Sequence, residues 1–228
     1  MFNVLNKIIS KHSDSDIVIS IRKKREKLRI LKDASDKRKL KNKNFTIFSS
    51  NCVGGVIYHS LGLRFLSPTI NLWIEPKDFI KILSYPEKYL KSNLIKEYST
   101  DKFTYPVGII KDVKIYGQHY SSFEELKTKW NERVQRINWN NVIVFMIQRD
   151  GCSYEDLKAF DKLPYKKKVV FTDQKYPEIK SSFVIPNSQE RKNVVSSLLV
   201  HKHWYSGLTD IDKFDYVDFI NTGKKGLR

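Results

Sequence analysis

Residues 44–62 constrain the fold of this chain more than any other stretch, because they predict a buried strand that turns sharply into a helix. The run 45–48 is short, apolar and β-prone, which is typical of a strand. After a polar turn, apolar residues recur at helical spacing, at Val53, Val56, Ile57 and Leu61. Asn51 is the expected N-cap of this helix. A strand that passes directly into a helix favours an α/β fold.

The rest of the chain alternates between further strand and helix patterns. Strands are predicted at 67–74, 107–110, 113–116, 142–147, 168–172 and 182–185. Helices are predicted at about 77–84, 122–137, 153–160 and 189–200, with an amphipathic segment at 86–98 and an Asp-rich end that caps and docks a terminal helix. The continuous apolar run 142–147 is typical of a strand buried on both faces. We therefore predict an α/β domain over residues 44–228, a three-layer, mainly parallel, Rossmann-like sheet with helices on both faces.

Positive charge is concentrated near the start of the sequence. The formal net charge is +17, and residues 22–43 hold twelve Lys or Arg against three acidic residues, which accounts for +9 of it. Residues 1–43 are therefore predicted to form a basic, amphipathic helical leader. An anionic membrane surface would suit this leader, and a solvated helix that packs on the body or pairs with another subunit is the alternative. Nucleic acid ranks last, because the segment has no aromatic interleaving and no nucleic-acid-reading motif.

The two cysteines, Cys52 and Cys152, lie far apart and each follows a strand-like run, so a disulfide scaffold is not indicated. No apolar run approaches the roughly 20 residues that span a bilayer, and the opening residues lack the features of a signal peptide. Together with reduced thiols, this pattern indicates a cytoplasmic protein. Peripheral attachment to the inner membrane face through the leader is compatible with that location.

Candidate functional residues follow the carboxyl ends of three predicted strands, where ligands of open parallel sheets bind. They are Ser50, Asn51 and Cys52 after the first strand, His119 after strand 113–116, and Arg149 and Asp150 after strand 142–147. The start of the first helix would offer backbone N–H groups and a positive dipole end to an anion, and it would favour the thiolate form of Cys52. The alternative is that Cys52 is a buried structural thiol beside a close-packing Gly54-Gly55 pair.

If Cys52 is a nucleophile, it needs a base within about 3 Å. His59 lies seven residues further along the same helix, about 10 Å away, so it cannot be that base directly. His119 comes from a different strand end and can fill this role. Arg149 could hold a phosphate or carboxylate in bidentate fashion, and Asp150 could act as a base or orient a sugar hydroxyl, whereas an ordinary turn with an ion pair is the alternative for both. No zinc-ligand spacing, Walker-type loop or complete dinucleotide motif occurs, so no metal is predicted.

Several short motifs follow one another along the sequence: 50–59 (SNCVGGVIYH), 61–63 (LGL), 67–72 (SPTINL), 105–108 (YPVG), 119–120 (HY), Trp130 with Arg133, 149–152 (RDGC), 163–165 (LPY) and 171–172 (FT). In these motifs the chain resembles the bacterial family catalogued as domain of unknown function 1919, whose members are generally labelled exopolysaccharide or capsule biosynthesis proteins. The likeness is placed on residues 44–222, outside the leader. It implies an α/β fold and, at matching positions, a site made of Asn51, Cys52, His59, His119, Arg149 and Asp150.

The resemblance and the candidate residues together predict a transferase in bacterial surface polysaccharide biosynthesis. It would move a glycosyl or acyl group from an activated donor, namely a sugar nucleotide, a lipid-linked sugar or an acyl donor, to a glycan or lipid-linked glycan, with no further cofactor. Catalysis would fall to Cys52, His119 and Asp150, and substrate binding to Ser50, Asn51, His59 and Arg149. The alternative is a non-catalytic, membrane-peripheral assembly factor that uses the basic leader on lipid.

Overall fold

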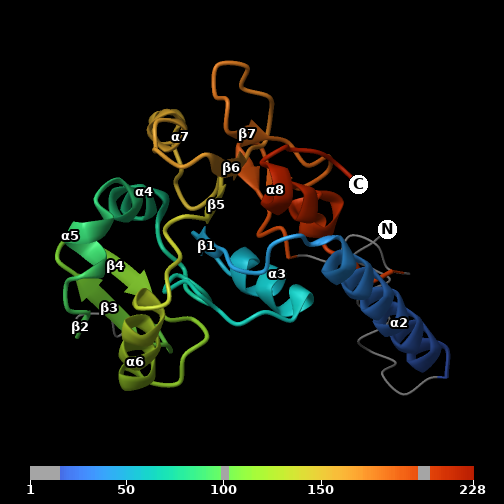
Figure 1. The fold of residues 1–228 in the computed structure, drawn as a ribbon, viewed down its shortest axis with the longest axis horizontal. Helices are drawn as coiled ribbons and strands as arrows, with labels where there is room; N and C mark the ends of the chain where they lie inside the picture. The colour runs from blue at the N-terminus through green and yellow to red at the C-terminus, as the bar shows by residue number, and fades with distance from the viewer. Residues whose placement is uncertain (1–15, 99–102, 200–205) are drawn as a thin grey trace.

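A parallel four-stranded sheet forms the centre of the molecule (Figure 1). The structure is a computed structural model that describes residues 16–98, 103–199 and 206–228. The strands of this sheet are β1 (Thr46–Ser49), β5 (Val142–Ile147), β6 (Lys167–Phe171) and β7 (Ser182–Phe183). They lie side by side in that order, and each neighbouring pair is parallel. All four carboxyl ends therefore point to the same edge of the sheet.

Alternating side chains of this sheet face two separate hydrophobic clusters. In β5, Val144 and Met146 belong to one cluster, whereas Ile143, Phe145 and Ile147 belong to the other. The first cluster is completed by helices α4 (Pro76–Ser84), α5 (Pro86–Leu90), α6 (Phe123–Val134) and α7 (Tyr154–Asp161). The second is completed by α3 (Val53–Leu61) and α8 (Tyr216–Thr222). Burial on both faces explains why β5 is apolar at every position, and the α/β class predicted from the sequence is confirmed.

A second, antiparallel sheet supports the loop that carries His119. It consists of β2 (Ile95–Lys96), β3 (Val107–Ile110) and β4 (Val113–Tyr116), in that order. Strands β3 and β4 form the predicted hairpin, and Lys111 in its turn adopts a left-handed φ of 56°. A two-way backbone bridge joins β4 to the segment after α3, because the N–H groups of Trp73 and Tyr116 each donate to the other residue's carbonyl at 3.0 Å. This bridge holds the small sheet close to the end of β1.

The strand predicted at 67–74 is wrong, because this segment crosses the end of β1 instead of extending a sheet. It consists mainly of turns, and Trp73 is the one residue of the segment that takes part in a β-bridge. Thr69 Oγ1 accepts a hydrogen bond from the N–H of Ser49 at 3.0 Å. Asn71 adopts a left-handed φ of 61°, which interrupts the extended backbone.

The helix predicted at 189–200 is also wrong, because the segment begins with a short hairpin of β8 (Gln189–Arg191) and β9 (Val194–Val195). Asn193 turns the hairpin with a φ of 60°, and Leu198 has a φ of 62°. A left-handed residue cannot continue a right-handed helix. The apolar residues that suggested helical spacing are instead packed on the sheet as separate anchors, as shown by the burial of Val195 and Leu198.

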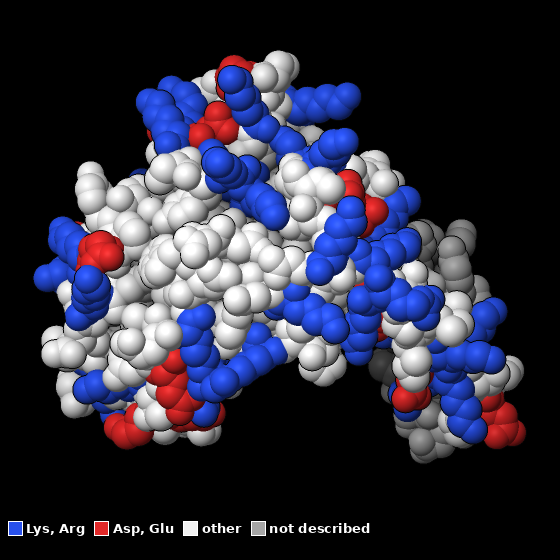
Figure 2. All heavy atoms as spheres, viewed as in Figure 1, with Lys and Arg blue, Asp and Glu red and all other residues white. Residues whose placement is uncertain are grey.

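Helix α2 (Asp16–Lys39) is long and basic, and it contacts both α3 and α8 (Figure 1). It contains ten Lys or Arg and four acidic residues, and Figure 2 shows the basic side chains gathered over it. Among the described helices, none is both long and apolar enough to cross a membrane. Residues 1–15 of the predicted leader lie outside the described part of the chain, and the predicted domain boundary after residue 43 stays a prediction.

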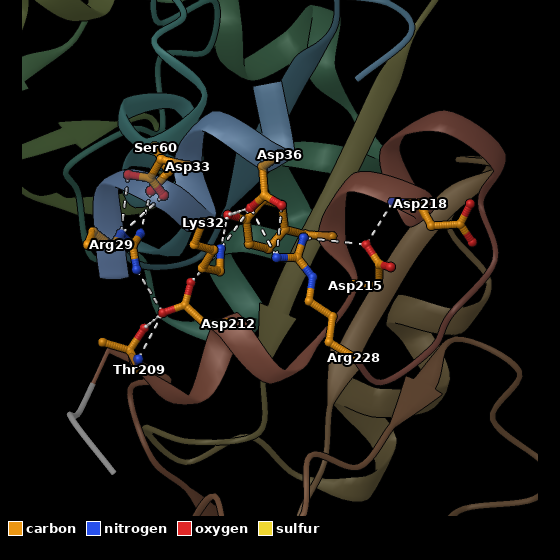
Figure 3. Close-up of polar contacts among 11 residues, drawn as sticks. Arg29, Lys32, Asp33, Asp36, Ser60, Thr209, Asp212, Asp215, Asp218 and Arg228 are labelled. Carbon is orange, nitrogen blue, oxygen red and sulfur yellow. Dashed lines mark hydrogen bonds and ion pairs between the residues drawn. The ribbon is translucent and has the colours of Figure 1, made fainter. Parts of the chain in front are cut away.

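A network of ion pairs and hydrogen bonds around two buried carboxylates ties α2 to the C-terminal part of the chain (Figure 3). We call it the ionic seam; its members are Arg29, Lys32, Asp36, Asp212, Tyr216 and Arg228. Arg29 Nη1 lies 2.8 Å from Asp212 Oδ2, in the 3-10 helix η1 (Asp210–Lys213). Lys32 Nζ lies 2.8 Å from Asp36 Oδ2 and 2.9 Å from Asp212 Oδ1. Both carboxylates are buried, at 1% and 4% exposure.

Candidate functional site

The thiol of Cys52 and the imidazole of His119 meet at the carboxyl end of β1. Cys52 lies three residues after β1, and its Sγ is 3.1 Å from His119 Nε2. His119 follows β4, and the bridge between Trp73 and Tyr116 brings that strand to this position. A thiol and an imidazole at this distance can share or transfer a proton.

A cavity of about 300 Å³ opens beside this pair. Its walls are formed by Asn51, Cys52, Trp73, Gln118, Arg149, Asp150, Ser197 and Leu199. The loops after β1 and β5 reach the same cavity because the two strands are direct neighbours, with Ser49, the last residue of β1, paired to Phe145 of β5. The structure thus brings together four residues singled out from the sequence, Asn51, Cys52, Arg149 and Asp150, around one space, with His119 in contact with the thiol.

Arg149 and Asp150 form a fixed pair on one wall of the cavity. Asp150 Oδ2 accepts a hydrogen bond from Trp73 Nε1 at 3.1 Å and another from Arg149 Nε at 3.2 Å. Asp150 also has a left-handed φ of 54°, so the turn after β5 is held in an uncommon conformation. Arg149 Nη1 pairs with Glu190 Oε1 at 3.6 Å, and no described residue accepts a hydrogen bond from it. Since Nη1 is buried beside Glu190, Arg149 contributes positive charge to this wall of the cavity.

The start of α3 differs from the predicted anion site. Cys52 itself, and not Asn51, is the N-cap, and it has a helical backbone conformation. Asn51 Oδ1 accepts a hydrogen bond from the N–H of Val53 at 3.0 Å, and Ser49 Oγ accepts one from the N–H of Gly54 at 3.3 Å. Because protein side chains already satisfy these two donors, an anionic ligand depends on Arg149 more than on the helix end.

Ser50 and His59 do not line the cavity. Ser50 is buried, its N–H donates to the carbonyl of Phe145 at 3.2 Å, and its carbonyl accepts from the N–H of Ile74 at 3.1 Å. These bonds make Ser50 a backbone link between β1, β5 and the crossing segment. His59 is exposed in the last turn of α3, so the structure does not bring it to Cys52.

Burial raises the pKa of the Cys52 thiol above its usual value. Burial thus opposes the thiolate form that the helix dipole was expected to favour, and a thiol with a raised pKa needs a base to become nucleophilic. Burial, with the nearby carboxylates of Asp156 and Asp150, raises the pKa of Cys152 further, to about 12. Cys152 is thus an inert thiol at neutral pH.

Four residues of the cavity were not predicted from the sequence, namely Trp73, Gln118, Ser197 and Leu199. Ser197 and Leu199 were hidden inside a wrongly predicted helix, and Trp73 inside a wrongly predicted strand. Gln118 directly precedes His119 in the loop after β4, which is the one signal that could have found it. Among the residues that the structure describes, no group of three or more His, Cys, Asp or Glu could hold a metal ion.

The fold and the site define an α/β protein with a thiol–imidazole pair beside an arginine at the carboxyl ends of adjacent parallel strands. The chain belongs to the family described as Domain of unknown function (DUF1919), whose model matches residues 23–221. A curated protein of Haemophilus influenzae, described as an uncharacterized protein, is 39% identical over 184 residues, which covers 81% of this chain and 87% of that relative. The resemblance found in the sequence is confirmed. Its start is corrected from residue 44 to residue 23, inside α2.

Proposed function

We propose that this protein is a transferase in which Cys52 is the nucleophile of an acyl-transfer reaction and His119 is its base. The observation that carries this proposal is the 3.1 Å contact between Cys52 Sγ and His119 Nε2 at the mouth of a cavity. Because burial raises the pKa of the thiol, proton removal by a neighbouring base is what would make it nucleophilic. A structural cysteine would not need an imidazole from a separate sheet at this distance.

The reaction would run in two balanced steps. In the first, His119 Nε2 takes the proton from Cys52 Sγ as the sulfur bonds to the acyl carbon of an activated donor; the bond to the donor's leaving group breaks, and that group takes the proton. In the second, a hydroxyl of the acceptor attacks the thioester and gives its proton to His119. The carbon–sulfur bond breaks, and the proton returns to Sγ.

The remaining cavity residues would bind and position the reactants. Arg149 lines the cavity and its positive charge suits an anionic part of the acyl donor. Asp150 accepts from both Trp73 and Arg149, which favours an orienting role over the general-base role expected from the sequence. Asn51 secures the turn that carries Cys52, since its amide also donates to the carbonyl of Ser197 at 3.2 Å.

For the acceptor, we propose a surface glycan or lipid-linked glycan, in line with the labels of the family that the sequence resembles. This role fits a cytoplasmic protein at the inner membrane face. For the fold, the proposal is a three-layer, Rossmann-like domain with a basic N-terminal helix. Helices pack on both faces of the parallel sheet and α2 is basic, which supports it, although the strand order of the described sheet shows no reversal.

Glycosyl transfer from a sugar nucleotide or lipid-linked sugar is the second candidate reaction, and Arg149 favours it as a partner for donor phosphate. The non-catalytic alternative, a membrane-peripheral assembly factor, is favoured by the exposed basic side chains of α2. Both alternatives leave the contact between Cys52 and His119 without a chemical role, which is why acyl transfer ranks first.

The test uses intact mass and turnover with a panel of acyl thioesters and sugar nucleotides, on the full chain and its C52S, H119Q and C152S variants. We expect an acyl adduct on the wild type and on C152S, none on C52S, and a loss of turnover of at least about 10³-fold in C52S. H119Q should slow adduct formation. If C52S keeps turnover with a sugar nucleotide within about threefold, the reaction is glycosyl transfer and the acyl-enzyme proposal is wrong.

A further inference from the structure

A second cavity, of about 500 Å³, lies next to the thiol cavity. Leu199 lines both spaces, and Val56 of α3 lines the second. Val56 follows Cys52 by four residues, which is one helical turn or about 6 Å along α3. A molecule that reaches Cys52 along this face of α3 would therefore extend toward the second cavity.

Three arginines of α2 line this second cavity, which we call the arginine cavity. Arg22, Arg25 and Arg29 are spaced three and four residues apart, so they share one face of α2, and Glu26 is the one acidic residue among the lining residues described. Arg29 is engaged by the protein itself, because its Nη1 donates to Asp212 at 2.8 Å, its Nε to Asp33 at 3.3 Å and its Nη2 to Ser60. The cavity wall thus combines one structural arginine with two others, Arg22 and Arg25, on the same helix face.

The stem of Arg25 is also held in place. A Cβ atom placed at Gly207 would lie 3.1 to 3.3 Å from the Cβ, Cγ and Cδ atoms of Arg25, so the Arg25 stem packs closely on this glycine. Gly207 also has a left-handed φ of 66°, which disfavours any other residue. Arg22 is exposed and less restrained. Packing of the Arg25 stem on Gly207 limits the directions in which its guanidinium can point, which reduces the entropy lost when a ligand binds.

We propose that the arginine cavity binds the phosphate groups of the activated donor whose reactive carbon is presented to Cys52. This inference deepens the proposed function and rests on it. Planar guanidinium groups match phosphate oxygens in bidentate pairs, and two arginines beside one space, Arg22 and Arg25, suit a diphosphate better than a single carboxylate. The phosphate could belong to a nucleotide-type donor or to a phosphorylated lipid carrier, and both share this chemistry.

The direct test is calorimetric binding of inorganic pyrophosphate to the full chain at 0.05 M and 0.15 M salt. We expect R22Q to bind about fivefold and R25Q about tenfold more weakly than the wild type, because each loses a charge-assisted contact. R25K keeps an aliphatic stem on Gly207 and loses only the planar guanidinium group that can form bidentate hydrogen bonds. It should bind pyrophosphate about threefold more weakly, with an unchanged melting temperature. The matched control is K23Q, an exposed basic residue of α2 that does not line the cavity, and it should stay within about twofold.

Equal affinities of R22Q, R25Q and K23Q, or no pyrophosphate binding by the wild type, would overturn the proposal. The same binding measurements are then made with three further ligands: uridine diphosphate, coenzyme A and vesicles that contain anionic lipid. A soluble nucleotide that binds more tightly than pyrophosphate, with the same loss in R22Q, identifies the soluble donor; vesicles that show this loss identify the lipid carrier. Vesicle binding that falls equally in R22Q and K23Q reflects general surface charge and counts against the cavity.

Failure of this inference can be told apart from failure of the proposed function. C52S should bind pyrophosphate as the wild type does, since the thiol does not touch the arginine cavity. If pyrophosphate binding depends on Arg22 and Arg25 but no acyl adduct forms on Cys52, the phosphate site stands and the acyl-transfer proposal falls. If the acyl adduct forms on Cys52 and R22Q leaves KM for the donor unchanged, the acyl-transfer proposal stands and the phosphate site falls.

Discussion

The ionic seam and the thiol cavity both join groups from distant parts of the sequence, but they differ in how fully those groups are satisfied. In the seam, Asp36 accepts hydrogen bonds from Lys32 at 2.8 Å, the hydroxyl of Tyr216 at 2.7 Å and Arg228 at 3.0 Å. In the cavity, Cys52 is half-buried in contact with His119, and open space lies beside it. The seam uses its charges to fix an arrangement, whereas the cavity leaves its reactive groups available.

This difference shows why a perturbed pKa alone does not mark a functional site in this protein. Burial would raise the pKa of Asp36, but hydrogen bonds from Lys32, Tyr216 and Arg228 outweigh it and leave the pKa lowered. Asp212 is in the same position, with burial opposed by Lys32 and Arg29. Yet no cavity opens onto either carboxylate among those described, so their shifts report structure.

The largest expected effect is loss of stability when the seam is broken. Asp36→Ala removes the shared acceptor of Lys32, Tyr216 and Arg228. Lys32 keeps Asp212 and Arg228 keeps Asp215, but the buried Tyr216 hydroxyl loses its carboxylate, so we expect the free energy of unfolding to fall by about 3 kcal/mol. Urea denaturation of the full chain measures this value.

The matched control is Asp33→Ala on the same helix. Asp33 pairs with Arg29 at 3.2 Å with 18% of its side chain exposed, and its loss should cost about 1 kcal/mol or less. Cys52→Ser should likewise cost about 1 kcal/mol or less, because the thiol lies in the open cavity. Equal destabilisation by Asp36→Ala and Asp33→Ala would mean that the seam does not hold α2 in place.

The sequence predicted those parts of both regions that depend on local pattern. The strand β5 follows from its apolar run, and the start of α7 follows from Ser153, whose side chain accepts from the N–H of Asp156 at 3.2 Å. The capping box predicted at Ser122 forms in part, because Ser122 accepts from the N–H of Glu125, while the Glu125 carboxylate bonds Ser121. Local spacing determines these features, so they can be recognised without the fold.

The contacts that define the two regions could not be predicted in this way. Asp36 and Arg228 are 192 residues apart, and Cys52 and His119 are 67 apart. Cys52 and Arg149 share a cavity because β1 pairs with β5, and no periodicity in a single strand encodes its neighbour. A sequence can thus indicate which side chains are able to act as nucleophile, base or anion-binding group before it can indicate which of them lie together in the fold.

The second expected effect is a loss of stability in acid that comes from the seam. Asp36 and Asp212 have lowered pKa values in the folded state, so their contribution is present above the unfolded value of about 3.9 and is lost as the pH falls through it toward the folded values. The unfolding free energy should fall below about pH 4, with a slope that approaches about 1.4 kcal/mol per pH unit for each titrating group.

Measuring this slope in 1 M NaCl distinguishes the seam from general charge repulsion. Salt screens the repulsion expected from a net charge of +17, whereas buried pairs are screened much less. The slope of unfolding free energy against pH should persist in high salt. In Asp36→Asn it should be smaller by about 1.4 kcal/mol per pH unit, the contribution of one titrating group. A slope that vanishes in 1 M NaCl would assign the acid sensitivity to the surface instead.

The smallest expected effect concerns the cavity and tests whether the Cys52 thiol is neutral at rest, in contrast to the charged carboxylates of the seam. Burial raises the pKa of Cys52, so the rate of its alkylation by iodoacetamide should rise with pH through a midpoint above about 8.5, measured by mass in the C152S variant. In the wild type, Cys152 should remain unmodified below about pH 10, because its pKa is about 12. A midpoint near 7 that is lost in H119Q would instead show a preformed thiolate–imidazolium pair. The cavity would then be an ion pair like the seam, and the two regions would differ in access to solvent alone.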